Sequence, residues 1–519
     1  MVCIWASALA LCAAPKGLGH LGRFPKWGKI EVVLAGPDLR GRADPNPFAI
    51  LVDAVFTSPT GNRYEVPAFY DGDGKGSLDG HVWKVRFAAD ETGEWTFGST
   101  SEHAQLDGYS ARFTVTSASR DAPGFWRWGR LERVGTPENG IRYLKFREGP
   151  YWLKAGCDDP ENFLGRFSNY DTIAERKAAV DYLAARGVNS LYMMTNNIDG
   201  DHRDVWPWLG ATPSEAKTNA SDSARFDVAK LEEWRELFEY MQAHGVVPYL
   251  VLDDDDCWTG YDRPRYYREM VARFGYLPAL LFNISEEHAE NYTLEQALAY
   301  AQLLKDLDPF DHPVGIHDVN GNIAAQADAY VDASQVDFTS IQTGGQDPLV
   351  HNPIALEWIA RCQARSKRVL MVGFDEGRPE EDRRGWWSAY LGGGVWEVHV
   401  RQADDRPHSA WEPAWTQLGG ARAFMESLPF WEMEPANHLV ESGTAFCLAK
   451  PGEAYALYLP VGGSVEVELL PGTYDCAWWK ASNGSEGSFE ARRTVKGGKQ
   501  QFTAPAEGDW ALRVVKKAD

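Results

Sequence analysis

Cysteine is scarce and scattered in this sequence. The 519 residues contain only seven cysteines, and no two of them have a CxxC spacing. Their odd number and wide separation favour neither a disulfide framework nor a zinc knuckle. Buried thiols are the simplest interpretation. The positions are Cys3, Cys12, Cys157, Cys257, Cys362, Cys447 and Cys476.

Positive charge is also in short supply. The chain has 52 Lys and Arg against 74 Asp and Glu, which gives a formal net charge of −22. Such a protein repels nucleic acids and anionic membranes at long range. We therefore expect no nucleic-acid partner. A strongly anionic substrate would need a local basic patch, and no Lys/Arg cluster that would override the net charge is visible in the sequence.

Long hydrophobic runs are missing after the first residues. Residues 2–14 form a short apolar run that resembles the h-region of a secretory signal, although a basic n-region is absent and Pro15 follows closely. We take residues 1–24 as a candidate signal segment and expect a secreted or periplasmic protein, with a cytoplasmic location as the alternative. No later run is long enough to span a bilayer.

Aromatic residues, in contrast, are abundant. There are 21 Trp, 21 Tyr and 23 Phe residues. Aromatic faces stack on the C–H faces of sugars, so this surplus suggests a carbohydrate partner, whereas core and interface packing accounts for most single aromatics.

The pattern of short strands and helices divides the chain into three folded parts. Residues 25–119 contain short strands separated by turn signals, which are typical of a β-sandwich. Residues 120–430 begin with a lead-in hairpin and then alternate strands with helices. Residues 431–519 return to strand character and predict a second, small β-sandwich.

Eight strand–helix units are expected in the middle part. This number over roughly 280 residues is typical of a closed (β/α)8 TIM barrel. A doubly wound open sheet is the alternative, but no Gly-rich nucleotide fingerprint follows the first strand. The expected strands cover residues 151–155, 189–194, 247–252, 278–284, 314–317, 336–342, 369–376 and 395–399.

Polar and aromatic residues follow these expected strands at one end. Because the carboxyl ends of barrel strands form the catalytic rim, we expect a substrate site there. A solvated or helix-capping role is the usual one for any single loop carboxylate. The run 253–256 of four aspartates lacks the interleaved ligands and glycines of a calcium loop. The candidate substrate-binding residues are Asn283, Asp159, Asn162, Asn196, Asp254, Trp258, Tyr261, His317, Gln342, Trp396 and Glu397.

Two strand ends carry paired carboxylates. The fourth strand ends near Glu286 and Glu287, and the seventh ends in Asp375 and Glu376. A glycoside hydrolase needs one carboxylic acid to protonate the leaving oxygen and a second carboxylate to attack or to activate water. If strand alternation persists, Asn283 and Glu287 share one face. We therefore predict Glu287 as the acid/base, Glu286 as its structural or pKa-setting neighbour and Glu376 as the nucleophile.

The order sandwich, barrel, small sandwich resembles the apiosidase-like glycoside hydrolases, which carry an N-terminal β-sandwich and a C-terminal collagen-binding-like β domain. The segment 159–164 (Asp-Pro-Glu-Asn-Phe-Leu) and the Asp-Glu pair of the seventh strand match motifs of this family. The segment 282–288 matches a third motif, with departures at Phe282, Ser285 and His288. The resemblance implies an acid/base after strand four, a nucleophile after strand seven and a retaining mechanism.

The sequence thus predicts a retaining glycoside hydrolase that acts on a plant or algal cell-wall glycan or a derived oligosaccharide. No cofactor is expected, and no HxH or HExxH spacing suggests zinc. A non-catalytic carbohydrate-binding or adhesion protein on a degenerate barrel is the alternative. An inverting hydrolase is a third interpretation, and the separation of the two carboxyl groups distinguishes it from a retaining one.

Overall fold

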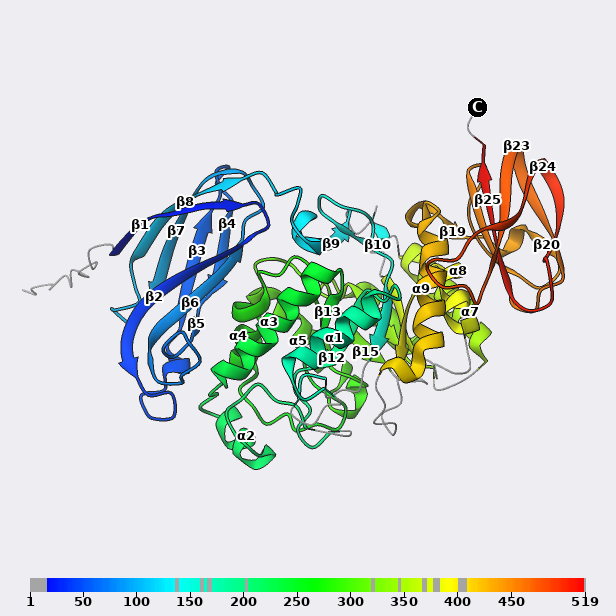
Figure 1. The fold of residues 1–519 in the computed structure, drawn as a ribbon. Helices are drawn as coiled ribbons and strands as arrows, with labels where there is room; N and C mark the ends of the chain where they lie inside the picture. Colours follow the sequence, from blue (N-terminus) through cyan, green and yellow to red (C-terminus); the bar gives the residue numbers. More distant parts are fainter. Residues whose placement is uncertain are drawn as a thin grey trace, which may run out of the picture.

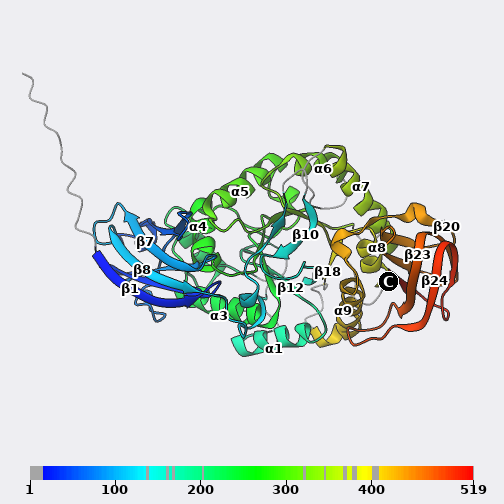
Figure 2. The ribbon, with the colours of Figure 1, turned by 90° about the horizontal axis from the view of Figure 1, so that it is seen from above.

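Three folded parts follow one another along the molecule (Figures 1 and 2). The computed structural model describes residues 16–135, 140–158, 163–165, 170–200, 204–318, 323–343, 347–365, 371–376, 383–399 and 408–517. A β domain lies at each end and a barrel lies between them. The fold class predicted from the sequence is confirmed. Among the described helices, none combines the length and the apolar character needed to cross a bilayer.

The N-terminal domain consists of two sheets. The larger sheet has the order β1 (Lys16–Pro25), β8 (Tyr109–Thr116), β7 (Gly93–Ser101), β3 (Val52–Thr57) and β4 (Arg63–Pro67). The smaller sheet has the order β2 (Lys29–Leu39), β6 (Gly80–Ala88) and β5 (Phe69–Tyr70). Alternating apolar residues meet between the sheets, with Phe56 stacked on Phe87 at 4.2 Å. The first strand begins at Lys16, so residues 16–24 of the candidate signal segment are part of this domain.

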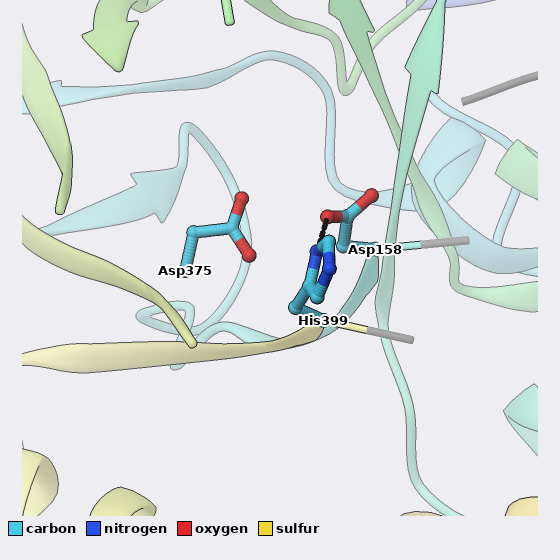
Figure 3. Close-up of side chains that lie close together, drawn as sticks. All are labelled: Asp158, Asp375 and His399. Atoms are coloured by element: carbon cyan, nitrogen blue, oxygen red, sulfur yellow. Dashed lines mark hydrogen bonds and ion pairs between the residues drawn. The ribbon is translucent and has the colours of Figure 1, made fainter. Parts of the chain in front are cut away.

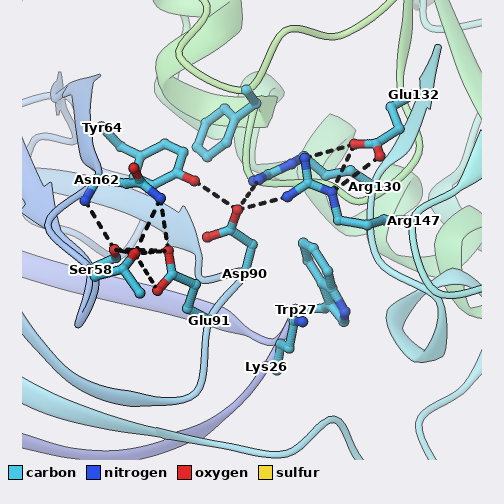
Figure 4. A network of polar contacts seen from close by, with 12 residues as sticks. Lys26, Trp27, Ser58, Asn62, Tyr64, Asp90, Glu91, Arg130, Glu132 and Arg147 are labelled. Atoms are coloured by element: carbon cyan, nitrogen blue, oxygen red, sulfur yellow. Dashed lines mark hydrogen bonds and ion pairs between the residues drawn. The ribbon is translucent and has the colours of Figure 1, made fainter. Parts of the chain in front are cut away.

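A buried ionic network joins the N-terminal domain to the hairpin of β9 (Leu131–Val134) and β10 (Ile141–Phe146) (Figure 4). The carboxylate of Asp90 accepts hydrogen bonds from Arg130, Arg147 and Tyr64 at 2.7–2.8 Å. Burial opposes its ionisation, but the charge of Arg130 and the other donors outweigh burial and lower the pKa of Asp90. The network fixes the domain to the chain segment that leads into the barrel.

We expect Asp90→Asn to destabilise the folded protein by about 3 kcal/mol at pH 7, because Arg130 is left buried without its counter-charge. The folded-state pKa of Asp90 is lower than its ordinary value of 3.8, so this stabilisation is present above that value and is lost as pH falls through the folded-state pKa. Urea unfolding at pH 7 and pH 3 measures both effects. The neighbouring Glu91→Gln is the control, since Glu91 bonds Ser58, Thr60 and Asn62 only within the N-terminal domain. An equal loss for both variants would contradict the prediction.

Eight parallel strands close into the barrel, with the last strand paired to the first. The strands are β11 (Ala155–Asp158), β12 (Ser190–Met194), β13 (Val247–Val251), β14 (Leu281–Asn283), β15 (Val314–Asp318), β16 (Phe338–Ile341), β17 (Met371–Glu376) and β18 (Val395–His399). The first strand begins four residues later than predicted, because Tyr151 instead bridges to Lys145 of the hairpin. The fourth strand has only three residues, which matters for the site.

Helices cover the outside of the barrel (Figures 1 and 2). They are α1 (Ile173–Ala184), α3 (Val228–His244), α4 (Arg263–Phe274), α5 (Leu294–Leu307), α6 (Ile323–Asp332), α7 (His351–Ala364), α8 (Arg383–Leu391) and α9 (Glu412–Glu426), and α2 (Pro213–Ala220) lies in the loop after β12. The capping box of Thr293 and Gln296 is confirmed at the start of α5. A 3-10 turn at Pro348–Val350 precedes α7, so Asn352, which the sequence Asn-Pro suggests as an N-cap, lies inside the helix.

The C-terminal domain is built on seven hydrogen-bonded strands. They are β19 (Glu434–Pro435), β20 (Val440–Ser442), β21 (Phe446–Lys450), β22 (Ala454–Leu459), β23 (Ser464–Lys480), β24 (Glu490–Thr503) and β25 (Trp510–Lys516). The long strand β23 pairs with β24 on one edge and with β20 and then β25 on the other. Trp387 of α8 stacks on Tyr458 at 5.4 Å, and Arg383 forms an ion pair with Asp509. The five cysteines of the described residues are buried and form no disulfide with one another.

Candidate functional site

Four carboxyl groups converge inside the barrel near the carboxyl ends of its strands. Strand register places Asp158 opposite His399 and Asp375 opposite Glu397. Because side chains alternate along a strand, Glu397 and His399 share the same face of β18. Glu286 joins them from the turn after β14. All four carboxyl groups belong to residues that are at most 8% exposed.

Glu286 is held by two neighbours. The hydroxyl of Tyr192 on β12 donates a hydrogen bond to its Oε2, and Nδ1 of His317 lies 2.8 Å from its Oε1. The backbone N–H of Glu286 donates to the carbonyl of Asp253 at 2.8 Å, which fixes the turn. Burial raises the pKa of Glu286 to about 8. A carboxyl group with this pKa retains its proton at neutral pH and can act as a general acid.

Asp375 stands across from a second acid–histidine pair (Figure 3). His399 Nδ1 lies 2.7 Å from Asp158 Oδ2, and the Asp375 carboxylate faces this pair. Neither oxygen of Asp375 has a hydrogen-bond partner among the described residues. Burial raises the pKa of Asp375 well above its ordinary value, and the negative charge of Asp158 raises it further.

Glu286 and Asp375 approach each other beside His317. An oxygen of each and a nitrogen of His317 all lie within 4.8 Å of one another. Two carboxyl groups at this distance cannot both be ionised without strong repulsion, so the pair retains one proton over a wide pH range. A pair that shares one proton supplies one acid and one base, which is the protonation state that glycoside hydrolysis requires.

Glu397 has a different environment from the pair. It is fully buried and forms an ion pair with Lys154, whose ammonium group also lies 4.2 Å from the ring centroid of Tyr249. Gly156 leaves room for it, since a Cβ at that position would lie 2.7 Å from Glu397 Oε1. The sequence placed Glu397 among substrate-binding residues, whereas the structure places it against Lys154 in the barrel interior.

Three groups of side chains have the donors that a divalent ion takes. They are Asp158, Asp375 and His399, then Glu286, His317 and Asp375, and at the rim Asp255, Glu287 and Glu290. Asp375 belongs to both buried groups. A metal ion held there would use the oxygens that a nucleophilic Asp375 needs, so the two roles exclude each other.

Glu287 lies at the rim beside this interior cluster. Its backbone has φ +27°, so the strand alternation on which its assignment was based stops before it is reached. Strand β14 in fact ends at Asn283, and the turn that follows directs Glu286 into the interior. Burial raises the pKa of Glu287 to about 7, partly opposed by the charge of His317.

Most of the remaining polar candidates are buried and hydrogen-bonded to other side chains or to the backbone. Asn283 donates to the hydroxyl of Tyr192 at 3.3 Å, and Asn196 donates to Asp253 at 2.7 Å. Asp254 is fully buried, and its carbonyl accepts a hydrogen bond from Asn291. Gln342, just after β16, is partly exposed.

The aromatic candidates divide into two kinds. Trp258 is partly exposed near the strand-three loop. Tyr261 is a core residue: it is 8% exposed, packs against Trp208 at 5.1 Å and donates its hydroxyl to Asp253. Trp396 is likewise buried, between His351 and Phe374. Both side chains are buried in aromatic packing, and their assignment as sugar contacts stays a prediction.

Three predicted residues have no described side chain. Asp159 and Asn162 lie outside the described residues. Glu376 ends β17, but its side chain is likewise outside the description. Their assignments stay predictions.

Sequence reasoning gave no role to Tyr192 and Lys154. Tyr192 is a polar-tipped residue among the apolar residues of β12, at a position whose side chain points into the barrel. This position could have identified it from the sequence. Lys154 precedes β11 and carried no comparable signal. Asp158 and His399 also end barrel strands but were given no role, and of the pair at the end of strand seven Glu376 was preferred to Asp375.

Comparison with known proteins identifies the N-terminal domain and the fold. Residues 23–102 match the family model described as "Domain of unknown function (DUF5060)". A provisionally assigned glycoside hydrolase from Bacteroides vulgatus ATCC 8482 superposes with a TM-score of 0.71 and 15% identity, covering 96% of this chain and all of its own. No curated protein matches the sequence.

Two further solved structures share the barrel. One is a glycoside hydrolase family 5 protein from the same organism, with a TM-score of 0.60, 14% identity and coverage of 77% of this chain and 96% of its own. Another, described as a glycoside hydrolase, has a TM-score of 0.60, 15% identity and coverage of 76% and 99%. At these identities the comparison establishes the fold: the chain has the multidomain TIM-barrel architecture found in glycoside hydrolases.

Proposed function

We propose that this protein is a retaining glycoside hydrolase whose catalytic pair is Glu286 and Asp375. The observation that carries the proposal is the approach of their carboxyl oxygens to within 4.8 Å inside the barrel. Retaining enzymes hold their two carboxyl groups about 5–5.5 Å apart, whereas inverting enzymes leave roughly 6.5–9.5 Å for a water molecule. A short separation therefore favours double displacement.

The environment of each carboxyl group supports a separate role. Glu286, with its pKa raised to about 8, donates its proton to the leaving glycosidic oxygen. When the shared proton is on Glu286, Asp375 carries the negative charge. Burial raises the pKa of Asp375, so its carboxylate is a strong base, and its oxygens have no hydrogen-bond donor among the described residues to compete with attack on the anomeric carbon. The C–O bond to the leaving group breaks as the bond to Asp375 forms. Glu286 next takes a proton from water, which releases the sugar from Asp375.

The surroundings of the pair support a sugar as the substrate. His317 Nε2 and Asn196 Oδ1 are buried without hydrogen-bond partners among the described residues, and sugar hydroxyl groups can both donate and accept. Trp258 offers a partly exposed ring for stacking. The resemblance to apiosidase-like hydrolases supports a plant or algal cell-wall glycan as the substrate, and the apolar run of residues 2–14 supports export from the cell.

We expect Glu286→Gln to lower kcat/KM on natural glycans by about 10²–10⁴-fold, because an amide cannot protonate the leaving oxygen. Activity of the wild type should fall as pH rises through about 8, since the acid must be protonated, and this alkaline limb should disappear in Glu286→Gln. A dinitrophenyl glycoside, whose leaving group needs no proton, should be cleaved with a much smaller loss at the glycosylation step. A panel of aryl glycosides and wall polysaccharides, assayed from pH 4 to 10, provides the measurement.

The adjacent Glu287→Gln is the matched comparison. If it removes the alkaline limb and Glu286→Gln does not, the acid/base is Glu287, as the sequence alone predicted. Unchanged activity in EDTA is expected, because the proposed steps use no metal ion. Binding of glycans by the wild type without any cleavage would favour a non-catalytic carbohydrate-binding protein.

A further inference from the structure

The C-terminal domain carries a small pocket lined by arginines. It has a volume of about 290 Å³ and lies where β23, β24 and β25 meet, the strands labelled at the C-terminal end in Figure 1. Arg492, Arg493 and Thr494 come from β24 and Arg513 comes from β25. We call these four residues the arginine pocket.

Two of these guanidinium groups lie over the same aromatic ring. The Cζ atom of Arg513 is 4.0 Å from the ring centroid of Phe489, and that of Arg492 is 5.9 Å from it. Phe489 in turn packs against Trp479 and Phe424, so it is anchored to the domain and to α9. The ring of Phe489 therefore keeps the guanidinium groups of Arg492 and Arg513 near each other.

The arginines of the pocket lack the ion pairs that buried arginines such as Arg86 and Arg273 form elsewhere among the described residues. No ion pair of Arg492, Arg493 or Arg513 occurs among the described residues, and Nε of Arg513 is buried without a hydrogen-bond partner there. Asp475 is the one carboxylate in the wall, and its Oδ1 accepts a hydrogen bond from Thr494. Burial lowers the pKa of Arg513, and the positive charge of Arg492 lowers it further.

This concentration of positive charge contrasts with the net charge of −22. Like charges clustered in this way repel one another, and a bound anion would relieve that repulsion and accept bidentate hydrogen bonds from the guanidinium groups. We propose that the arginine pocket binds the carboxylate or sulfate-ester groups of an anionic polysaccharide. The choice of a polysaccharide rests on the proposed glycoside hydrolase function, whereas the preference for an oxyanion rests on the arginines alone.

The pocket would then supply the local basic patch that a strongly anionic glycan requires. Long-range repulsion from the rest of the protein disfavours general adsorption of polyanions, so binding at physiological salt must come from a local site. A guanidinium fork fits both a planar carboxylate and a sulfate.

Binding of three polymers tests the proposal. Affinity electrophoresis and calorimetry at about 0.15 M salt, where screening acts within about 8 Å, would compare polygalacturonate, dextran sulfate and neutral dextran. The full-length wild type should bind at least one anionic polymer about tenfold or more tightly than dextran. Preference between polygalacturonate and dextran sulfate distinguishes carboxylate from sulfate recognition. Equal binding to dextran, or no binding to either anionic polymer, would overturn the proposal.

Variants that remove the same charge at different positions distinguish binding by the arginine pocket from a general effect of net charge. Arg492→Gln/Arg513→Gln should weaken binding by about tenfold or more, because it removes the charged hydrogen-bond donors. Lys450→Gln/Lys499→Gln removes the same charge from the same domain, but at lysines already paired with glutamates, and should leave binding unchanged. An equal loss in both double variants would contradict the proposal. Arg513→Lys keeps the charge without the fork, and weakened binding there with an unchanged melting temperature separates recognition from folding.

Two further measurements test the arginine pocket and the proposed hydrolase activity separately. Hydrolysis of a small neutral aryl glycoside should be the same in the wild type and in the arginine variant, since the pocket is outside the barrel. Anionic glycan binding without hydrolysis of any substrate would support the pocket and contradict the proposed enzyme. Arginine-dependent binding of double-stranded DNA in preference to both anionic glycans would replace the polysaccharide with a nucleic acid and overturn the proposal.

Discussion

Asp375→Asn is expected to lower kcat by a factor on the order of 10⁴ or more, because an amide cannot form the glycosyl ester that double displacement requires. The substitution keeps the size of the side chain and removes a charge that has no hydrogen-bond partner among the described residues, so the folded state should be retained or slightly stabilised. Steady-state rates and thermal unfolding on the same samples measure both quantities.

The covalent intermediate gives a more specific readout for the role of Asp375. A 2-fluoro glycoside with a good leaving group should accumulate on the wild type as an ester, and mass spectrometry of the peptides should locate the sugar at residue 375. Added azide should partly restore cleavage by Asp375→Asn and give a glycosyl azide of inverted configuration.

Glu376→Gln is the matched control for the nucleophile. It changes the next carboxylate on the same strand and should leave the ester on Asp375. A label at Glu376, together with near-normal turnover by Asp375→Asn, would instead support the nucleophile predicted from the sequence. An inverted product from the wild type would contradict double displacement on either residue.

Lys154→Met is expected to destabilise the barrel by about 3–5 kcal/mol, because it leaves Glu397 buried without its counter-charge. The side chains of Lys154 and Glu397 are at most 3% exposed, so solvent provides little screening. Burial already raises the pKa of Glu397, opposed chiefly by the charge of Lys154. Urea unfolding followed by tryptophan fluorescence and by activity measures the loss.

The double variant Lys154→Met/Glu397→Gln distinguishes the loss of a counter-charge from a change of packing at this position. Removing both charges should restore most of the lost stability, since replacing a whole buried ion pair is often neutral. Glu397→Gln alone should mainly affect stability. If it instead raises KM strongly with unfolding unchanged, Glu397 contacts the substrate, as the sequence analysis predicted.

The sequence was sufficient for the barrel because its signals are local. Helix caps such as Thr293 with Gln296, and alternation of strands with helices, depend on residues close to one another along the chain. The start of the first strand was missed because Tyr151 bridges to the hairpin at Lys145, a pairing outside the repeating strand–helix units.

The choice between Glu286 and Glu287 depended on where strand β14 ends. Alternation was extended from Asn283 to Glu287, but β14 stops at Asn283 and the backbone of Glu287 has a positive φ. A turn of this kind depends on contacts with other strands, such as the hydrogen bond from the Glu286 N–H to Asp253. Convergence of the arginine pocket was equally hidden, because Arg492 and Arg513 lie on β24 and β25, which flank β23 only in the folded sheet.

The pairing of acidic and basic side chains inside the barrel has a consequence for inhibitors. Among the described residues, Lys154 pairs with Glu397, His317 with Glu286 and His399 with Asp158, whereas Asp375 forms no ion pair. Bond breaking at a sugar develops positive charge on the ring in an oxocarbenium-like state. A polyhydroxylated ring amine has the shape of a sugar and carries a positive charge when it is protonated. We therefore expect it to bind beside Asp375 more tightly than any neutral monosaccharide.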